Sequence, residues 1–214
     1  MYLETINSPA DVKKLSVEEM TALAAEMREA LIVRASRHMG HVGPDLGFIE
    51  ATVALHAVFS SPEDKIIYDI SHQTYPHKML TGRREAYTDP AHYDDVSAYS
   101  NPKESPHDFF ELGHTSVSID LALGMAKARD LLGGTEKVIA VIGDGSLSGG
   151  EALEGLNTAG EFKGQFLILV NDNQMSIAEN HGGLYASLEA LRESNGTSEN
   201  NLFRAMGLDY RYEA

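Results

Sequence analysis

Oxygen-bearing side chains directly follow two apolar runs in this sequence. Asp144 lies between two glycines after the run at residues 138–142, and Asn171 and Asn173 come after the run at residues 166–170. Carboxylate and amide oxygens are ligands that Mg²⁺ takes from a protein, and phosphate and water complete its shell. Either motif alone is an ordinary turn, but the pair at this spacing favours a magnesium site.

A phosphate group could bind beside the same carboxylate. The glycines next to Asp144 allow a ligand to approach the backbone closely. The backbone N–H groups of Gly145 and Ser146 begin a segment of helix composition. Free N–H groups at a helix N-terminus favour an anion. The sequence therefore predicts a joint magnesium and phosphate site.

The two apolar runs and the segment between them form a strand–helix–strand pattern. Runs this short and apolar are typical of parallel strands that are buried on both faces. Residues 147–160 carry apolar side chains at helical spacing, namely Ala152, Leu153, Leu156 and Ala159. Because such crossovers are right-handed, both strands point the same way. Their polar ends then meet at the carboxyl edge of the sheet, where α/β folds bind ligands.

The rest of the chain fits an α/β organisation. Ser16 and Glu19 form a capping box that begins a long helix, whose buried face carries Met20, Leu23, Ala24, Met27, Leu31 and Ile32. We expect further helices from residue 45 or 47, at 116–133 and at 201–206, and strands at 65–70 and 209–212. Residues 87–111 are expected to form a long loop. The predicted fold is a doubly wound α/β domain with a mostly parallel sheet and helices on both faces.

The composition restricts the classes of partner. The 214 residues include 17 basic and 32 acidic side chains, a net charge of −15, which argues against nucleic acid and anionic membranes. The absence of cysteine excludes disulfides and, together with the absence of HExxH-type spacing, disfavours zinc. Residues 1–15 lack an apolar signal core, and no stretch approaches the ~20 apolar residues of a membrane-spanning helix. We therefore expect a cytoplasmic protein.

Four sequence motifs follow one another along the chain. They are residues 71–84 (SHQTYPHKMLTGRR), 113–118 (GHTSVS), 143–145 (GDG) and 171–180 (NDNQMSIAEN). The GDG–NDN pair resembles the diphosphate–Mg²⁺ motif of thiamine-diphosphate enzymes. All four together, within a match from about Ser36 to Gly183, resemble the 1-deoxy-D-xylulose-5-phosphate synthase family.

The resemblance implies how the cofactor would bind. Asp144, the side chain of Asn173 and the backbone carbonyl of Met175 would hold Mg²⁺. Gly145 and Ser146 would hold the diphosphate of thiamine diphosphate. The cofactor site would also be lined by Gly113, His114 and Thr115.

Two of the nine histidines match catalytic positions of the family. His72 would face the diphosphate or the reacting centre, and His41 would face the thiazolium ring and the substrate. A histidine there could move protons, since the pKa of free imidazole lies near neutrality. Apart from His114, the other histidines lack a comparable context.

The resemblance also implies a reaction of isoprenoid biosynthesis, the decarboxylating transfer of a two-carbon unit from pyruvate to glyceraldehyde 3-phosphate. Full enzymes of the family also have a pyrimidine-binding domain, with the glutamate that activates the cofactor, and a C-terminal domain. We expect residues 1–214 to form a single diphosphate-binding domain without these two. An oligomer with a pyrimidine-domain subunit, or with the C-terminal half of the same enzyme, would then be needed for turnover.

Two departures from the family pattern leave alternatives open. Ser71 stands where the family usually has glycine, and residues 42–45 (VGPD) are more similar to transketolase-like forms. The chain could therefore be the N-terminal subunit of a transketolase-type ketol transferase, or a non-catalytic cofactor-binding homologue. A nucleotide-binding module is disfavoured, because neither a P-loop nor a dinucleotide-binding glycine motif occurs.

Overall fold

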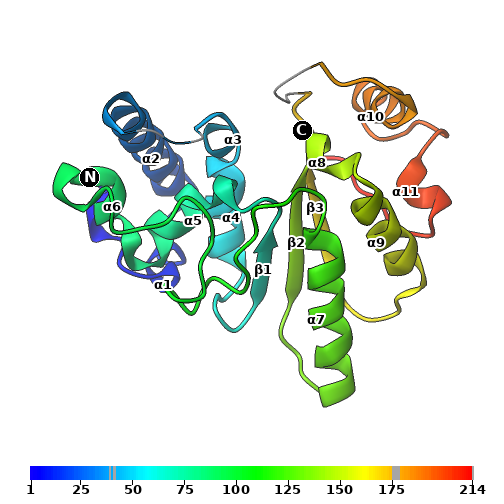
Figure 1. Cartoon of the computed structure of the whole chain (residues 1–214), viewed down its shortest axis with the longest axis horizontal. Coiled ribbons are helices and arrows are strands. Elements are labelled where there is room, and N and C mark those ends of the chain that lie inside the picture. Colours follow the sequence, from blue (N-terminus) through cyan, green and yellow to red (C-terminus); the bar gives the residue numbers. More distant parts are fainter. Residues whose placement is uncertain (39, 41, 175–178, 214) are drawn as a thin grey trace. The chain divides into compact units, whose positions relative to one another are not determined.

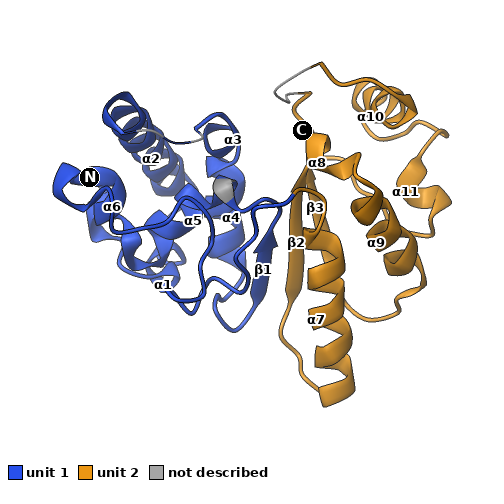
Figure 2. Cartoon of the chain, in the orientation of Figure 1, with its two compact units in different colours: residues 1–114 blue, residues 115–214 orange. Residues whose placement is uncertain are grey.

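The computed structural model describes residues 1–38, 40, 42–174 and 179–213 (Figure 1). The chain divides into two compact units, residues 1–114 and residues 115–214, which are coloured separately in Figure 2. Of the predicted site residues, His41 and Met175 lie outside the described residues. The expectation of a single diphosphate-binding domain stays a prediction.

The described part of unit 1 is mostly helical and contains one short strand. Its elements are η1 (Leu3–Thr5), α1 (Pro9–Val12), α2 (Val17–Arg37), α3 (Gly43–Leu46), α4 (Ile49–Val58), β1 (Lys65–Tyr68), η2 (His72–Thr74), α5 (Tyr75–Lys78), the π-helical turn η3 (Met79–Arg83), α6 (Glu85–Thr88) and η4 (Pro90–His92). The predicted capping box begins α2, because the Ser16 N–H donates to Glu19 Oε2 over 2.7 Å and the Glu19 N–H donates to Ser16 Oγ over 3.2 Å. The long helix is therefore confirmed.

The core of unit 1 lies between α2 and the shorter helices α4 and α6. Leu23, Met27 and Leu31 on α2 are fully buried there. Ile32 was predicted on the same face, but its side chain is 48 % exposed. One step along a helix turns the side chain by about 100°, so Ile32 points away from the face that Leu31 buries.

Strand β1 is shorter than the predicted 65–70. It ends at Tyr68 because Ile70 and Ser71 adopt φ angles of 59° and 61°, in the left-handed region, where a strand cannot continue. His72 begins the 3₁₀ turn η2 directly afterwards. The predicted position of His72 beyond the carboxyl end of a strand is therefore confirmed.

Unit 2 contains two parallel strands with flanking helices (Figure 1). Its elements are α7 (Ser118–Leu132), β2 (Val138–Gly143), α8 (Asp144–Leu147), α9 (Gly150–Glu161), β3 (Leu167–Asn171), α10 (Gly183–Glu193) and α11 (Leu202–Ala205). Gly133 ends α7 with a φ of 72°, as predicted. The predicted α/β class, with parallel strands between helices, is confirmed.

Three expectations for unit 2 need correction. The helix predicted at 147–160 is present as α9 but begins only at Gly150, because Gly149 has extended backbone angles and Leu147 belongs to the separate short helix α8. Strand β2 is buried, but β3 is not buried on both faces: its residues are half-exposed and Leu167 is 45 % exposed. The strand predicted at 209–212 does not form. Tyr210 instead stacks on Phe203, with 5.3 Å between the ring centroids.

In the described part of the chain, none of the helices combines the length and apolar character needed to cross a membrane.

Candidate functional site

The carboxyl ends of β2 and β3 lie side by side in unit 2. In the parallel register Gly143 pairs with Asn171, so Asp144 and Asp172 follow the two strands at neighbouring positions. Asn173 comes two residues beyond the end of β3 and is exposed. The strand ends therefore meet as the sequence predicted, which places a carboxylate of the GDG motif at the edge of the sheet.

Asp144 is a buried carboxylate at this edge, with only 2 % of the residue exposed. Its Oδ2 accepts a hydrogen bond from Asn180 Nδ2 over 3.2 Å. Burial, and then the nearby charge of Asp172, raise the pKa of Asp144. Both effects disfavour an isolated negative charge, so a bound cation would stabilise the ionised carboxylate.

Asp172 links the strand edge to helix α10. Its Oδ2 lies 2.5 Å from Nη1 of Arg192, which is in the last turn of that helix. Its Oδ1 is buried and has no hydrogen-bond partner among the described residues. Sequence reasoning did not identify Arg192 or Asn180 as neighbours of the site. The only signal for Asn180 was its place as the last residue of the NDNQMSIAEN motif.

The turn after β2 provides backbone donors. Gly143 is the N-cap of α8, so Gly145 and Ser146 lie in its first turn, where backbone N–H groups do not bond to a helix carbonyl oxygen; the Gly145 N–H bonds to the Asp144 carboxylate. Both residues are half-buried. A carboxylate beside such donors suits a metal ion that also binds a phosphate group.

The GHTSVS motif contacts this turn through Ser116. Ser116 is buried with a φ of 77°, and its Oγ donates to the carbonyl oxygen of Ser146 over 2.7 Å. A Cβ added at Gly149 would clash with the Ser116 side chain. The predicted cofactor-lining residues just before it, Gly113, His114 and Thr115, are exposed; the first two belong to unit 1 and Thr115 belongs to unit 2.

In unit 1, the turn that begins with His72 is fixed by two of its own side chains, which bond to the backbone just before it. Gln73 Nε2 donates to the carbonyl oxygen of Asp69 over 3.0 Å, and Thr74 Oγ1 donates to that of Ser71 over 2.5 Å. These bonds hold the backbone around His72. For this predicted catalytic residue, the structure describes the backbone.

The segment that contains His41 is tied to the residues following the His72 turn. Asp45 is fully buried, and its Oδ1 accepts from the Tyr75 N–H over 2.9 Å. Burial raises the pKa of Asp45 well above its ordinary value. A Cβ at Gly40 would lie 3.2 Å from the Tyr75 hydroxyl, so the backbone next to His41 passes close to that ring. The two segments with predicted catalytic histidines are therefore held together inside unit 1.

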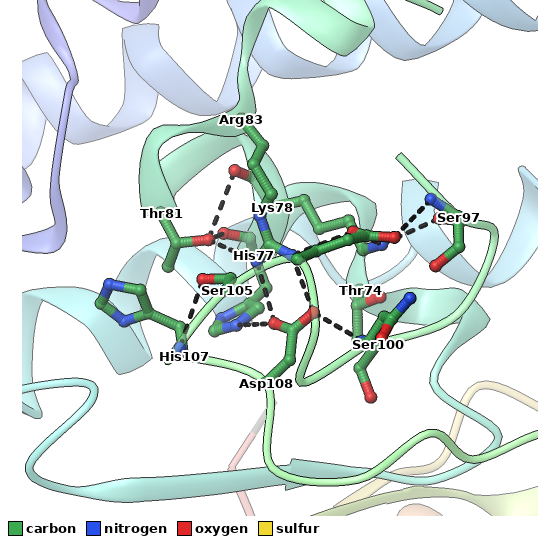
Figure 3. Close-up of polar contacts among 12 residues, drawn as sticks. Thr74, His77, Lys78, Thr81, Arg83, Ser97, Ser100, Ser105, His107 and Asp108 are labelled. Atoms are coloured by element: carbon green, nitrogen blue, oxygen red, sulfur yellow. Dashed lines mark hydrogen bonds and ion pairs between the residues drawn. The ribbon is translucent and has the colours of Figure 1, made fainter. Parts of the chain in front are cut away.

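A buried charged network anchors the long loop predicted at residues 87–111 (Figure 3). Lys78 Nζ donates to the carbonyl oxygens of Ser97 and Tyr99 over 2.8 and 2.7 Å, and to Glu104 Oε2 over 2.8 Å. Arg83 binds Asp108 through two hydrogen bonds of 2.7 and 2.9 Å. Sequence reasoning missed this network, because its partners lie 19 to 26 residues apart.

Two neutral histidines extend the network into the core. His56 Nε2 lies 2.9 Å from His77 Nδ1, and His77 Nε2 lies 3.3 Å from Asp108 Oδ1. Burial lowers the pKa of both histidines, that of His56 well below its ordinary value. His77 Nε2–H therefore donates to Asp108, and His56 Nε2–H donates to His77. This arrangement fits a structural role for both residues.

The predicted metal ligands include only one ionisable side chain, that of Asp144. The described ranges contain no group of three or more histidine, cysteine, aspartate or glutamate side chains that could hold a metal ion. The predicted set consists of one carboxylate, one amide and the backbone carbonyl of Met175, which lies outside those ranges. It therefore stays a prediction.

Comparison with known proteins gives one consistent answer. A 1-deoxy-D-xylulose-5-phosphate synthase of Carboxydothermus hydrogenoformans is 50 % identical over 190 residues, which cover 89 % of this chain and 30 % of that protein. 1-Deoxy-D-xylulose-5-phosphate synthase 1 of Geobacter metallireducens is 52 % identical over 182 residues, covering 85 % of this chain and 29 % of that protein. The chain thus spans about 30 % of the length of the curated relatives it matches. Residues 3–209 match the family model described as 1-deoxy-D-xylulose-5-phosphate synthase, and the chain belongs to this family.

Proposed function

We propose that this chain is the thiamine-diphosphate- and Mg²⁺-binding N-terminal part of a 1-deoxy-D-xylulose-5-phosphate synthase-type transferase. The enzyme would transfer a two-carbon unit from pyruvate, with loss of CO₂, to glyceraldehyde 3-phosphate. The observation that carries the proposal is the buried carboxylate of Asp144 at the carboxyl edge of β2, in a chain that belongs to this family.

The residues around Asp144 fit the cofactor. The GDG turn provides one hard oxygen ligand together with first-turn N–H groups, and Asn180 orients the carboxylate through its 3.2 Å hydrogen bond. Asn173 is exposed near the same strand ends. Mg²⁺ takes few protein ligands and the rest from phosphate and water, which matches this small donor set.

Each group would have a distinct task. Asp144, Asn173 and the Met175 carbonyl would hold the metal ion, and the N–H groups of Gly145 and Ser146 would hold the diphosphate. Thiamine diphosphate, when bound, supplies an electron sink for the decarboxylation.

The exposed Gly113, His114 and Thr115 would line the cofactor site. His72 and His41 would move protons to and from the reacting oxygens, with the neighbouring backbone fixed by Ser71, Thr74 and the Asp45–Tyr75 bond.

The remainder of the enzyme would come from another polypeptide segment. The chain spans about 30 % of its relatives, so we infer that a pyrimidine-domain subunit, or the C-terminal half of the same enzyme, completes the active site within an oligomer. The lone chain should anchor the diphosphate but show no turnover of its small-molecule substrates. Assaying CO₂ release from pyruvate, with and without a pyrimidine-domain chain, tests this; robust turnover by the lone chain would refute the need for a second one.

The cofactor-binding part of the proposal can be tested by calorimetry. Wild type should bind thiamine diphosphate in the presence of Mg²⁺, and Asp144→Ala should bind it at least tenfold more weakly, because loss of a charged ligand interaction costs about 1.5–3 kcal/mol. Asp209→Asn, at an exposed aspartate of the same unit, is the control and should bind like wild type. Equal binding by wild type and Asp144→Ala would show that the site is wrongly assigned.

A further inference from the structure

The turn between β1 and His72 has an uncommon backbone. Ile70 and Ser71 have φ angles of 59° and 61°, a conformation that glycine adopts readily and other residues rarely adopt. Such residues persist only where the surrounding structure holds them, and they cluster at functional sites. A serine in place of a glycine here calls for an interaction that its side chain makes.

The Ser71 hydroxyl makes two such interactions. Ser71 is fully buried, and its Oγ donates to the carbonyl oxygen of Leu112 over 2.6 Å. The same Oγ accepts a hydrogen bond from the backbone N–H of Ser100 over 3.1 Å. The hydroxyl is thus used both as donor and as acceptor, and glycine could provide neither bond.

The hydrogen-bond partners of the Ser71 hydroxyl show which segments it connects. Ser71 directly precedes His72, and Leu112 directly precedes Gly113 and His114. One side chain therefore joins two segments of unit 1, those of His72 and of Gly113–His114, that carry residues of the proposed cofactor site. The charged network described above holds the loop between Ser97 and Asp108. The Leu112 carbonyl lies beyond that stretch, and the Ser71 hydroxyl bonds to it directly.

We infer that Ser71 is a positioning residue, whose hydroxyl fixes the spacing between the His72 turn and the Gly113–His114 segment for cofactor binding. The inference rests on the proposed function, because the two segments matter together only if both face the cofactor. The link itself is a property of unit 1 and can be measured without any ligand.

Two variants separate the hydroxyl from the backbone. Ser71→Gly removes the hydroxyl and relieves the positive φ, whereas Ser71→Ala removes the hydroxyl and keeps the same backbone demand. Ser97→Ala is the matched control, because Ser97 Oγ donates to a backbone carbonyl on the same loop, that of Tyr99, over 2.8 Å. Thermal unfolding checks that all three variants fold.

The first measurement is hydrogen exchange of the Ser100 amide by NMR, because this N–H is the donor to Ser71 Oγ. We expect exchange about tenfold faster in both Ser71 variants, the factor that corresponds to one lost buried hydrogen bond, and unchanged exchange in Ser97→Ala. Unchanged exchange in both Ser71 variants, or faster exchange in Ser71→Gly alone, would overturn the inference, since the hydroxyl would then not hold the loop.

The second measurement is calorimetric titration with thiamine diphosphate and Mg²⁺. Both Ser71 variants should bind about tenfold more weakly than wild type and than Ser97→Ala. If wild type does not bind, the proposed function fails, while the exchange data still decide whether the link exists. If wild type binds, exchange rises and the variants bind equally well, the link does not position the cofactor site and the inference is wrong.

Discussion

Replacing Asp108 by asparagine should strongly destabilise unit 1. The side chain of Asp108 is fully buried, and it accepts two hydrogen bonds from Arg83, one from the Asn101 N–H over 2.8 Å and one from His77. Asparagine keeps the size and one acceptor oxygen but removes the negative charge. Among the described residues, Arg83, with 11 % of its side chain exposed, would then keep only Glu104 at 3.4 Å as an ionic partner.

The magnitude follows from the burial of this pair. Removing one partner of a buried ion pair costs about 3–5 kcal/mol, because the other charge is left without compensation in the protein interior. The oxygen that asparagine retains can still accept one of the bonds, so we expect the lower end, about 3 kcal/mol. This corresponds to roughly a 150-fold fall in the ratio of folded to unfolded protein.

An exposed arginine–carboxylate pair with a similar nitrogen–oxygen distance provides the control. Arg28 Nη2 lies 2.7 Å from Glu50 Oε1, but these side chains are 37 % and 62 % exposed. Glu50→Gln should therefore lower the unfolding free energy by less than about 1 kcal/mol. Equilibrium urea unfolding of the three proteins, followed by circular dichroism, measures both changes. A cost of Asp108→Asn that is no larger than that of Glu50→Gln would refute the reasoning from burial.

The difference between wild type and Asp108→Asn should also depend on pH. Burial alone would raise the pKa of Asp108, but hydrogen bonds from His77 and Arg83 hold it below the ordinary value of 3.8. A carboxylate whose pKa is lower in the folded state contributes stability that is present above the unfolded pKa. The contribution is lost as pH falls through the lower folded pKa. The difference in unfolding free energy between wild type and Asp108→Asn should therefore be constant above about pH 5 and become smaller below about pH 4.

Two further substitutions, one in each unit, test packing, and urea unfolding measures their effect on the free energy of unfolding. Gly149→Ala should cost about 1–3 kcal/mol, because the new Cβ would clash with Ser116, whereas Gly150→Ala meets no atom within 4 Å and should cost almost nothing. Arg34→Lys should cost about 2 kcal/mol, because the buried guanidinium donates to two carbonyl oxygens and lies over three tyrosine rings. The exposed Arg37→Lys should change stability by less than about 0.5 kcal/mol. Equal effects within either pair would contradict the packing argument.

Features that depend on neighbouring residues were predictable from the sequence. The strand ends at Gly143 and Asn171 were predicted to meet because strand–helix–strand crossovers are right-handed, and they do meet. The capping box at Ser16 and the end of α7 at Gly133 each follow from local patterns, and both are present. Such patterns reflect backbone preferences and periodicity, which act within a few residues.

Side-chain contacts between distant residues were not predictable. The bonds from Ser71 to Leu112 and from Asn180 to Asp144 join residues 41 and 36 positions apart. The sequence gives no sign of which polar side chains will meet after folding. The predicted strand at 209–212 does not form, and the ring contact between Tyr210 and Phe203 was likewise not visible in the sequence.

The central claim is that Asp144 holds the metal ion of a thiamine diphosphate cofactor. Crystals of the chain grown with thiamine diphosphate and Mn²⁺, which takes the same oxygen ligands as Mg²⁺, would test it most directly. We predict an anomalous peak at bonding distance from a carboxylate oxygen of Asp144 and from a diphosphate oxygen of the cofactor. A bound cofactor whose metal ion lies elsewhere, with Asp144 still hydrogen-bonded only to protein, would contradict the account.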